Sequence, residues 1–275
     1  MNSTYMQLRK NLEYLKLNQM NLQLDEIIDF ITKNSLSFAE GLVKLTSYEI
    51  DFKEANMVRS MVKVAGFPHH KELKDFDFSF QPSINKQEIK DYETLRFIES
   101  QENLVFLGSS GVGKTHLAVS IGIAAAKKRY STYFIKCNNL LQQLKKAKLE
   151  NRLGDRLKHF TKYKVLIIDE LDSKFHTLLT KEVLKIFHKF STEKCQLIAV
   201  VQDSCLMDTS FIRPDQIWFI DKDWATGKSE IYSLVEYKIK KKQSYSTDYL
   251  NGLYGAIPLF SSYEDIDNLM IKGTD

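Results

Sequence analysis

One eight-residue segment constrains the fold of this chain more than any other. It reads Gly108-Ser109-Ser110-Gly111-Val112-Gly113-Lys114-Thr115 and follows a short apolar run from Asn103 to Leu107. The pattern G-x-x-x-x-G-K-T between a strand and a helix is typical of a loop whose backbone N–H groups wrap around phosphates. The helix that follows directs its positive N-terminus at the same place. Such a loop requires a strand-turn-helix unit.

Three further apolar runs, at residues 132–135, 165–168 and 197–201, have the length and composition of buried parallel strands. Helical segments of ten or more residues separate them. This alternation predicts an α/β fold: a P-loop NTPase with a parallel, doubly wound sheet. The interval from Lys114 to Asp169 is too short for the insertion and Ser-Gly signature loop of ABC-type ATPases. We therefore expect an AAA+-like or RecA-like three-layer core.

The candidate site residues lie in this loop and in an acidic pair. Lys114 is expected to reach the β and γ phosphates of ATP, and the Thr115 hydroxyl is expected to bind Mg²⁺. The run 165–168 ends in Asp169 and Glu170, and we expect its strand to lie beside the strand that precedes the loop. Asp169 would then hold the Mg²⁺ water shell, while Glu170 and Lys114 are the predicted catalytic residues, with Glu170 activating water. The predicted nucleotide-binding residues are Gly108, Ser109, Ser110, Gly111, Val112, Gly113, Lys114, Thr115 and His116.

Charge is unevenly distributed along the chain. The 275 residues carry a net charge of +4, yet residues 101–190 hold 17 basic and seven acidic residues. From Lys127 to Lys164 there are 12 basic residues, opposed only by Glu150 and Asp155. Such an excess predicts a polyanion partner, namely DNA. The alternative is a solvated lysine-rich helix face.

The remaining sequence suggests three regions. Residues 1–66 have helical spacing of leucine and isoleucine, with Ser37 before a second amphipathic run, and are expected to form the core of a small helical bundle, whose partner the spacing does not identify. Residues 67–100 are expected to form a linker and a helix at 86–99. Residues 101–275 would be the ATPase core, with an atypical portion at 171–275.

Three widely spaced cysteines favour a reducing, cytoplasmic location, and no apolar run approaches the roughly 20 residues that span a membrane.

Residues 1 to about 170 resemble the IstB/DnaC family, the ATP-binding helpers of insertion-sequence transposition and their helicase-loader relatives. The resemblance rests on residues 65–68, 75–78, 102–108, 113–118 and 166–170. It implies an AAA+ ATPase that contacts DNA, assembles into a homo-oligomer and binds a transposase through its N-terminal helices. In that family, the flank at 127–164 faces DNA.

Beyond Glu170 the chain departs from that pattern and is similar to the C-terminal part of the OLD/RloA-type, ABC-like ATPases of phage abortive infection. The matching stretches include residues 213–219, 229–234 and 249–258. The sensor pair and arginine finger of the first family are missing, and Gln202 stands where the second has a switch histidine. Arg213 is the sole late arginine, for which a surface or structural role is favoured.

We therefore expect an IstB-like ATP-binding helper of DNA transposition whose hydrolysis is impaired, because loss of an arginine finger removes about 10³–10⁵ in rate. Two alternatives stay open: a phage-defence ATPase, and a nucleotide-binding interaction module without turnover.

Overall fold

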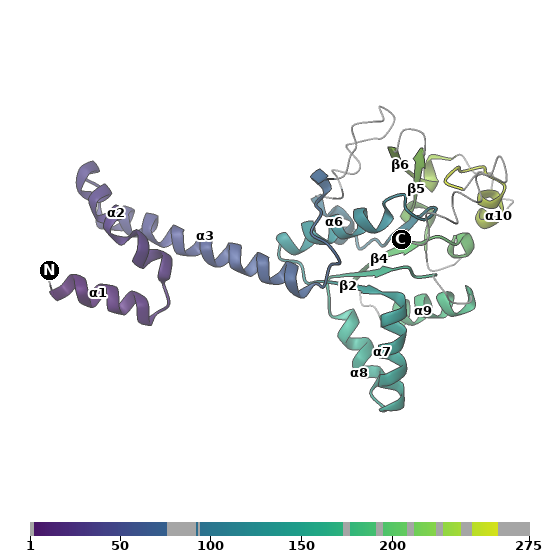
Figure 1. The fold of residues 1–275 in the computed structure, drawn as a ribbon, viewed down its shortest axis with the longest axis horizontal. Helices are drawn as coiled ribbons and strands as arrows, with labels where there is room; N and C mark the ends of the chain where they lie inside the picture. Colours follow the sequence, from purple (N-terminus) through teal and green to yellow (C-terminus); the bar gives the residue numbers. More distant parts are fainter. Residues whose placement is uncertain are drawn as a thin grey trace. The chain divides into compact units, whose positions relative to one another are not determined.

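The computed structural model describes residues 3–75, 92, 94–172, 177–190, 195–207, 212–223, 228–237 and 244–257. Six strands form one sheet in the order β2-β3-β4-β1-β5-β6 (Figure 1). The first five are parallel, and β6 pairs antiparallel with β5. The strands are β1 (Leu104–Leu107), β2 (Thr132–Lys136), β3 (Val165–Asp169), β4 (Gln196–Val201), β5 (Ile217–Asp223) and β6 (Lys228–Ser233).

The predicted α/β class and the four predicted strands are confirmed, but one expectation about their order is wrong. The strand that ends at Asp169 does not lie beside the strand before the loop. β4 lies between them, since it pairs with β1 through Leu104–Ile198 and with β3 through Leu166–Leu197. The acidic strand end therefore reaches the loop across one intervening strand.

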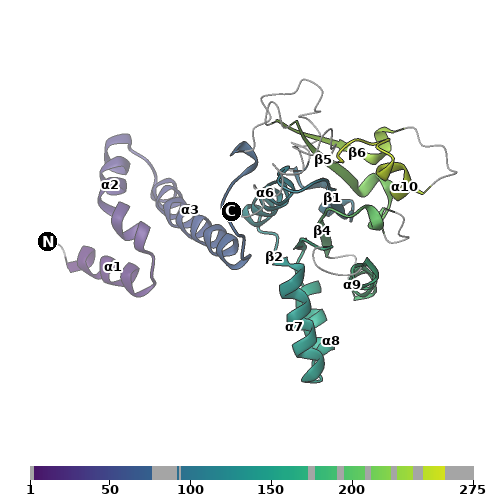
Figure 2. The same ribbon diagram turned by 45° about the vertical axis from the view of Figure 1, so that its right-hand side comes forward.

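Helices cover both faces of the sheet, which gives the predicted three layers. On one face, α6 packs against alternate strand residues such as Phe106 and Ile167. On the other face, α7, α8, α9 and α10 cover the intervening residues, such as Leu107 and Ile168 (Figures 1 and 2). The helices are α5 (Arg96–Glu99), α6 (Lys114–Lys127), α7 (Cys137–Leu149), α8 (Leu153–Thr161), α9 (Thr177–Phe190) and α10 (Tyr245–Leu250). Within the described part of the chain, no helix is long and apolar enough to cross a membrane.

The chain divides into two compact units, residues 1–61 and 62–275. The first contains α1 (Ser3–Tyr14), α2 (Asn18–Asn34) and the greater part of α3 (Phe38–Val64). Its core is small and consists of Leu12, Met20, Leu24, Ile27 and Leu45. Ser37 begins α3 through a capping box: the Ser37 backbone N–H donates to Glu40 Oε2 at 2.8 Å, and the Glu40 N–H donates to Ser37 Oγ at 3.3 Å.

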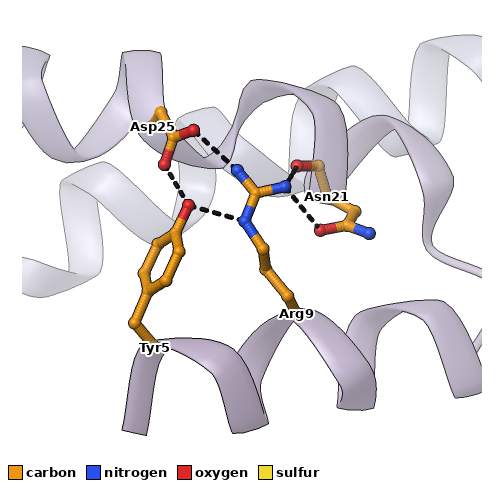
Figure 3. A network of polar contacts seen from close by, with 4 residues as sticks. All are labelled: Tyr5, Arg9, Asn21 and Asp25. Atoms are coloured by element: carbon orange, nitrogen blue, oxygen red, sulfur yellow. Dashed lines mark hydrogen bonds and ion pairs between the residues drawn. The ribbon is translucent and has the colours of Figure 1, made fainter. Parts of the chain in front are cut away.

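Polar contacts supplement this small core. The Arg9 guanidinium donates to Asp25 at 2.6 Å and to the Tyr5 hydroxyl at 2.6 Å, and it also reaches Asn21, so α1 is fastened to α2 (Figure 3). The buried Glu49 of α3 accepts from the Gln19 N–H at 2.8 Å and thereby caps the first turn of α2. Hydrogen bonds and an ion pair between side chains therefore join the helices of this unit, whose apolar core is small.

Within the second unit, residues 65–75 pack along β2 and α6. The Phe134 N–H donates to the Ala65 carbonyl at 2.8 Å, and the Ser120 hydroxyl donates to the Lys71 carbonyl at 3.1 Å. Glu72 forms an ion pair of 2.7 Å with Lys127. Of the helix expected at 86–99, the structure describes residue 92, residues 94–95 and α5. Residues 86–91 and the motif at 76–78 lie outside the described residues.

Candidate nucleotide-binding site

The loop between β1 and α6 lies at the carboxyl end of the parallel strands. Two of its glycines are required by its path. A Cβ on Gly108 would stand 2.0 Å from the Ile220 carbonyl oxygen of β5, and Gly113 caps α6 with a φ of 104°. Because α6 begins at Lys114, its first unpaired N–H groups face the concave side of the loop. An anion is favoured at this position.

The Lys114 ammonium is held at the start of the same loop. It donates to the carbonyl of Gly108 at 2.9 Å and to that of Ser109 at 2.5 Å. Burial lowers the pKa of Lys114 from 10.5 to about 8, partly offset by Asp172 and Asp169. A buried ammonium with only carbonyl partners on the described residues is poised to exchange one of them for a phosphate oxygen.

Thr115 and Asp169 are brought together across the intervening strand. The Thr115 hydroxyl donates to Asp169 Oδ1 at 2.9 Å. Asp169 is almost fully buried, and burial raises its pKa, whereas the Thr115 bond lowers it. A hydroxyl and a carboxylate oxygen at this separation form the hard-oxygen donor set that Mg²⁺ prefers, and the ion would favour the charged carboxylate. The two residues therefore fit the predicted metal.

Glu170, the predicted water-activating residue, is engaged by a partner that sequence reasoning missed. Lys136 Nζ donates to Glu170 Oε1 at 2.7 Å, with both side chains close to half exposed. Glu170 has a φ of 53°, in the left-handed region, so the chain turns sharply after β3. Lys136 is the last residue of β2 and is paired in register with Asp169. The one signal in the sequence for this contact is that Lys136 directly follows an apolar run, as Asp169 does.

A cavity of about 290 Å³ joins these groups. Its lining contains eight predicted site residues together with Val200 and Gln202. The predicted residues are Ser110, Gly111, Gly113, Lys114, Thr115, His116, Asp169 and Glu170. The other predicted residues lie elsewhere: the Val112 side chain is buried in the core, Gly108 abuts β5, and Ser109 lines a neighbouring cavity.

Gln202 follows β4 and is fixed in place by a second residue that the sequence did not single out. The Asp172 carboxylate accepts from the backbone N–H of Gln202 at 2.5 Å and from that of Asp203. Asp172 thus ties the turn after β3 to the turn after β4. It holds Gln202 at the edge of the cavity, where the side-chain amide can hydrogen-bond to an oxygen.

The C-terminal described segment provides a further wall beyond Ser110. A cavity of about 410 Å³ is lined by Ser109, Ser110, Gln202, Tyr249, Leu250 and Ile257. The segment is fastened by tyrosines: Tyr232 and Tyr237 donate to the Tyr254 carbonyl at 2.6 and 3.2 Å, and Tyr249 donates to the Ala256 carbonyl at 2.7 Å. Residues after 170 therefore contribute to the surroundings of the loop.

Arg213 lies outside both cavities. Its guanidinium makes a bidentate contact with Asp215, with the shortest distance 2.7 Å, and it approaches Glu102 at 3.6 Å. It precedes β5 and is more than half exposed. In this arrangement Arg213 has the surface role that the sequence favoured. Among the described residues that line the 290 Å³ cavity, none is an arginine.

The basic segment 127–164 consists mainly of α7 and α8. These two helices extend away from the sheet as a hairpin (Figures 1 and 2). They pack through Leu140 and Ala147 of α7 and through Leu157 and Phe160 of α8. Most of the cations are exposed, although Lys127 and Lys136 are engaged by Glu72 and Glu170. Exposed cations therefore lie on both helices of the hairpin, at Lys145, Lys146 and Lys148 of α7 and at Lys158 of α8.

Comparison with known proteins identifies one family. The sequence model of the IstB-like ATP-binding proteins matches residues 10–205. The ATP-binding protein of insertion sequence IS232 from Bacillus thuringiensis subsp. berliner is 68% identical over 171 residues, which are 62% of this chain and 68% of the relative. The corresponding protein of IS21 from Pseudomonas aeruginosa is 30% identical over 193 residues, 70% of this chain and 72% of the relative.

Solved structures give weaker similarities. The DnaC helicase loader aligns with a TM-score of 0.37 and 28% identity, over 42% of this chain and 68% of its own. AMPPCP-bound DnaA from Aquifex aeolicus aligns with a TM-score of 0.43 and 15% identity, over 76% of this chain and 71% of its own. TM-scores this low support no argument about the site.

Proposed function

Because the chain belongs to the family of IstB-like ATP-binding proteins, we propose that it binds ATP with Mg²⁺ at the loop 108–115 and acts as an ATPase helper of DNA transposition. One observation carries the proposal: the Thr115 hydroxyl and the Asp169 carboxylate meet at 2.9 Å beside Lys114 and the N-terminus of α6. Phosphate-binding and metal-binding groups thus converge on one cavity, although they come from distant parts of the sequence.

Each residue has a proposed part in this chemistry. The loop N–H groups and Lys114 bind the phosphates, and Thr115 with Asp169 would hold Mg²⁺, which neutralises charge on the phosphates when bound. Glu170 orients and deprotonates the attacking water, and Gln202 can donate to the water or to the terminal phosphate. Lys136 opposes this step, because its ammonium occupies Glu170 Oε1 and leaves only the second carboxylate oxygen to accept a proton from water.

We place DNA contact on the α7–α8 hairpin. Its outer surface carries exposed cations such as Lys145, Lys158 and Lys162. If Z of these cations touch phosphates, the logarithm of the binding constant should fall with the logarithm of salt concentration at a slope of about −0.9Z. Binding that does not change between low and moderate ionic strength would remove this part of the proposal.

The N-terminal helices are the proposed contact for a transposase or another protein, within a homo-oligomer. Val43, Ile50 and Met57 of α3 recur every seven residues and are exposed, Val43 by 69%. At 100° per residue they lie about 120–160° around the helix from Leu45, which faces the core of the unit. A helix that is apolar on both sides favours burial of its outer side against a partner.

A second candidate function, a nucleotide-binding module without turnover, is favoured by the Lys136–Glu170 pair and by the engagement of Arg213 with Asp215. The phage-defence alternative rests on the resemblance of residues 171–275 to OLD/RloA-type ATPases. The match to the IstB-like family continues to residue 205, so the expectation that this family's pattern ends at Glu170 is wrong, and residues 171–205 do not support this alternative. Under this alternative, α10 and the tyrosine-fastened segment would recruit the partner.

Hydrolysis of ATP by the purified protein, with and without duplex DNA, tests these alternatives. Lys114→Ala and Glu170→Gln should each abolish DNA-stimulated turnover if the helper proposal is correct, and Glu170→Gln should retain nucleotide binding. Binding without turnover in the wild-type protein would favour the module. Absence of nucleotide binding would overturn both.

A further inference from the structure

The α7–α8 hairpin contains a cavity that the proposed DNA contact does not by itself explain. It measures about 410 Å³, within the range of about 300–1,000 Å³ that small-molecule sites occupy. It lies between facing residues of the two helices. Its lining residues are Gln143, Lys146, Ala147, Glu150, Arg152, Asp155, Arg156 and His159.

The lining of this cavity holds three cations and two carboxylates. Lys146, Arg152 and Arg156 contribute their cations there, and Glu150 is paired with Arg152. Arg156 donates to Gln143 and lies over the ring of Phe160, 4.8 Å from its centroid, so its guanidinium is held in place at the cavity wall. A fixed guanidinium presents several donors in one plane, which suits a phosphate oxygen pair.

Among the lining residues, His159 carries the aromatic ring. The His159 ring lines the cavity and meets the ring of Tyr163 edge-on at 5.6 Å and that of Tyr133 at 6.2 Å. Tyr133 and Tyr163 are stacked at 4.9 Å, and none of these three residues is fully buried. Burial, Arg156 and Lys162 lower the pKa of His159, so its ring is a neutral stacking surface at neutral pH.

From this arrangement we propose that the cavity binds one unpaired nucleotide of DNA, with its phosphate at Arg156 and Lys146 and its base against His159. Cations and an aromatic ring in one cavity fit the phosphate and the base of a nucleotide, and base stacking on such a ring is largely independent of sequence. The Asp155 carboxylate on the lining can accept a hydrogen bond from an amino group of the base. In a regular duplex, the paired and stacked bases cannot enter. The hairpin therefore selects DNA with a bulge, a gap or a single strand.

This inference rests on the proposed DNA contact. The test uses the full chain with fluorescent oligonucleotides of the same sequence: a regular duplex, a duplex with one unpaired nucleotide, and a single strand. Wild-type protein should bind the bulged duplex about tenfold more tightly than the regular one. His159→Ala should remove most of this preference, and His159→Phe, which keeps a ring, should restore it. Arg156→Ala should weaken binding more than Lys158→Ala, its control on the same helix outside the cavity.

Equal affinity of the wild-type protein for the bulged and regular duplexes overturns the inference while leaving the DNA contact intact. Equal losses in His159→Ala and Lys158→Ala overturn it as well, since the cavity would then act only through charge. Displacement of the single strand by an acidic peptide of matched charge would assign the cavity to a protein partner instead. If the wild-type protein shows no salt-dependent binding to any of the three oligonucleotides, the proposed DNA contact itself fails. Fluorescence of 2-aminopurine at the unpaired position gives an independent readout, because stacking on His159 should quench it.

Discussion

The loop at 108–115 and the α7–α8 hairpin lie in the same unit but position their functional groups in opposite ways. At the loop, the groups are backbone amides and a few buried side chains, such as Lys114 and Asp169, fixed by a sheet that is buried on both faces. On the hairpin, they are exposed cations on two helices that extend from the sheet. Function at the loop is thus concentrated in single residues. The proposed affinity of the hairpin for duplex DNA is shared among many.

From this difference we expect the largest effect of a single substitution at Lys114. Replacing it by alanine removes a charged donor to phosphate, so ATP affinity should fall by about 1.5–3 kcal/mol, or roughly 10- to 150-fold. Titration with a fluorescent ATP analogue measures this loss. Lys127→Ala is the matched control, because Lys127 ends the same helix and is paired with Glu72, and it should leave the affinity unchanged. If the two variants behave alike, the loop does not bind the nucleotide through Lys114.

The next largest effect is the dependence of ATP affinity on pH. Burial lowers the pKa of Lys114 to about 8, and the protonated amine is the form that binds phosphate. ATP affinity should therefore fall by up to about tenfold per unit as the pH rises above 8. In the unfolded chain this lysine stays protonated up to its ordinary pKa of 10.5. Because the unfolded chain then binds more protons than the folded one, this group makes the free energy of unfolding increase as the pH rises from 8 to 10.5. Calorimetric titrations with ATP across this pH range measure the slope of log affinity against pH. The Lys114→Ala variant should lack this slope.

The same comparison explains which strands and which site residues could be predicted from the sequence alone. The strands β1 to β4 are predictable because each contains a run of at least three apolar residues, as largely buried strands do. β5 also begins with four apolar residues, Ile217 to Ile220, a signal that the sequence analysis did not use, whereas β6 is a polar edge strand and gives no such signal. The loop residues could be assigned because their chemistry is local in sequence.

Contacts between strand ends could not be predicted in this way. The pair formed by Lys136 and Glu170 depends on β2 lying next to β3, and the position of Asp169 depends on β4 lying between β3 and β1. Strand order is not encoded in the spacing of apolar runs. The hairpin cavity was not expected either, because the spacing of apolar residues did not indicate that the region between β2 and β3 forms two helices, α7 and α8, with a turn at Asn151, whose φ is 54°.

A smaller effect is expected where the loop site meets the hairpin. Lys136 ends β2 directly before α7 and holds Glu170 at 2.7 Å. Because an exposed ion pair contributes about 0.2–1 kcal/mol, Lys136→Met should raise the turnover of ATP by up to about fivefold and leave nucleotide affinity unchanged. Steady-state hydrolysis measures this gain. The double variant with Glu170→Gln should be as inactive as Glu170→Gln alone, and activity in that variant would rule out Glu170 as the water-activating residue.

The smallest effect belongs to a single exposed cation of the hairpin. Lys158 lies on α8 outside the cavity, so its replacement by alanine removes at most one phosphate contact. Affinity for a regular duplex should fall by about twofold to fivefold, and the slope of log affinity against log salt should become shallower by about 0.9. Anisotropy titrations at several salt concentrations measure both quantities. Lys63→Ala, which removes the same charge from α3, should change neither. A loss at Lys158 as large as the one expected at Lys114 would show that the hairpin also concentrates its function in single residues, and the contrast between the two regions would not hold.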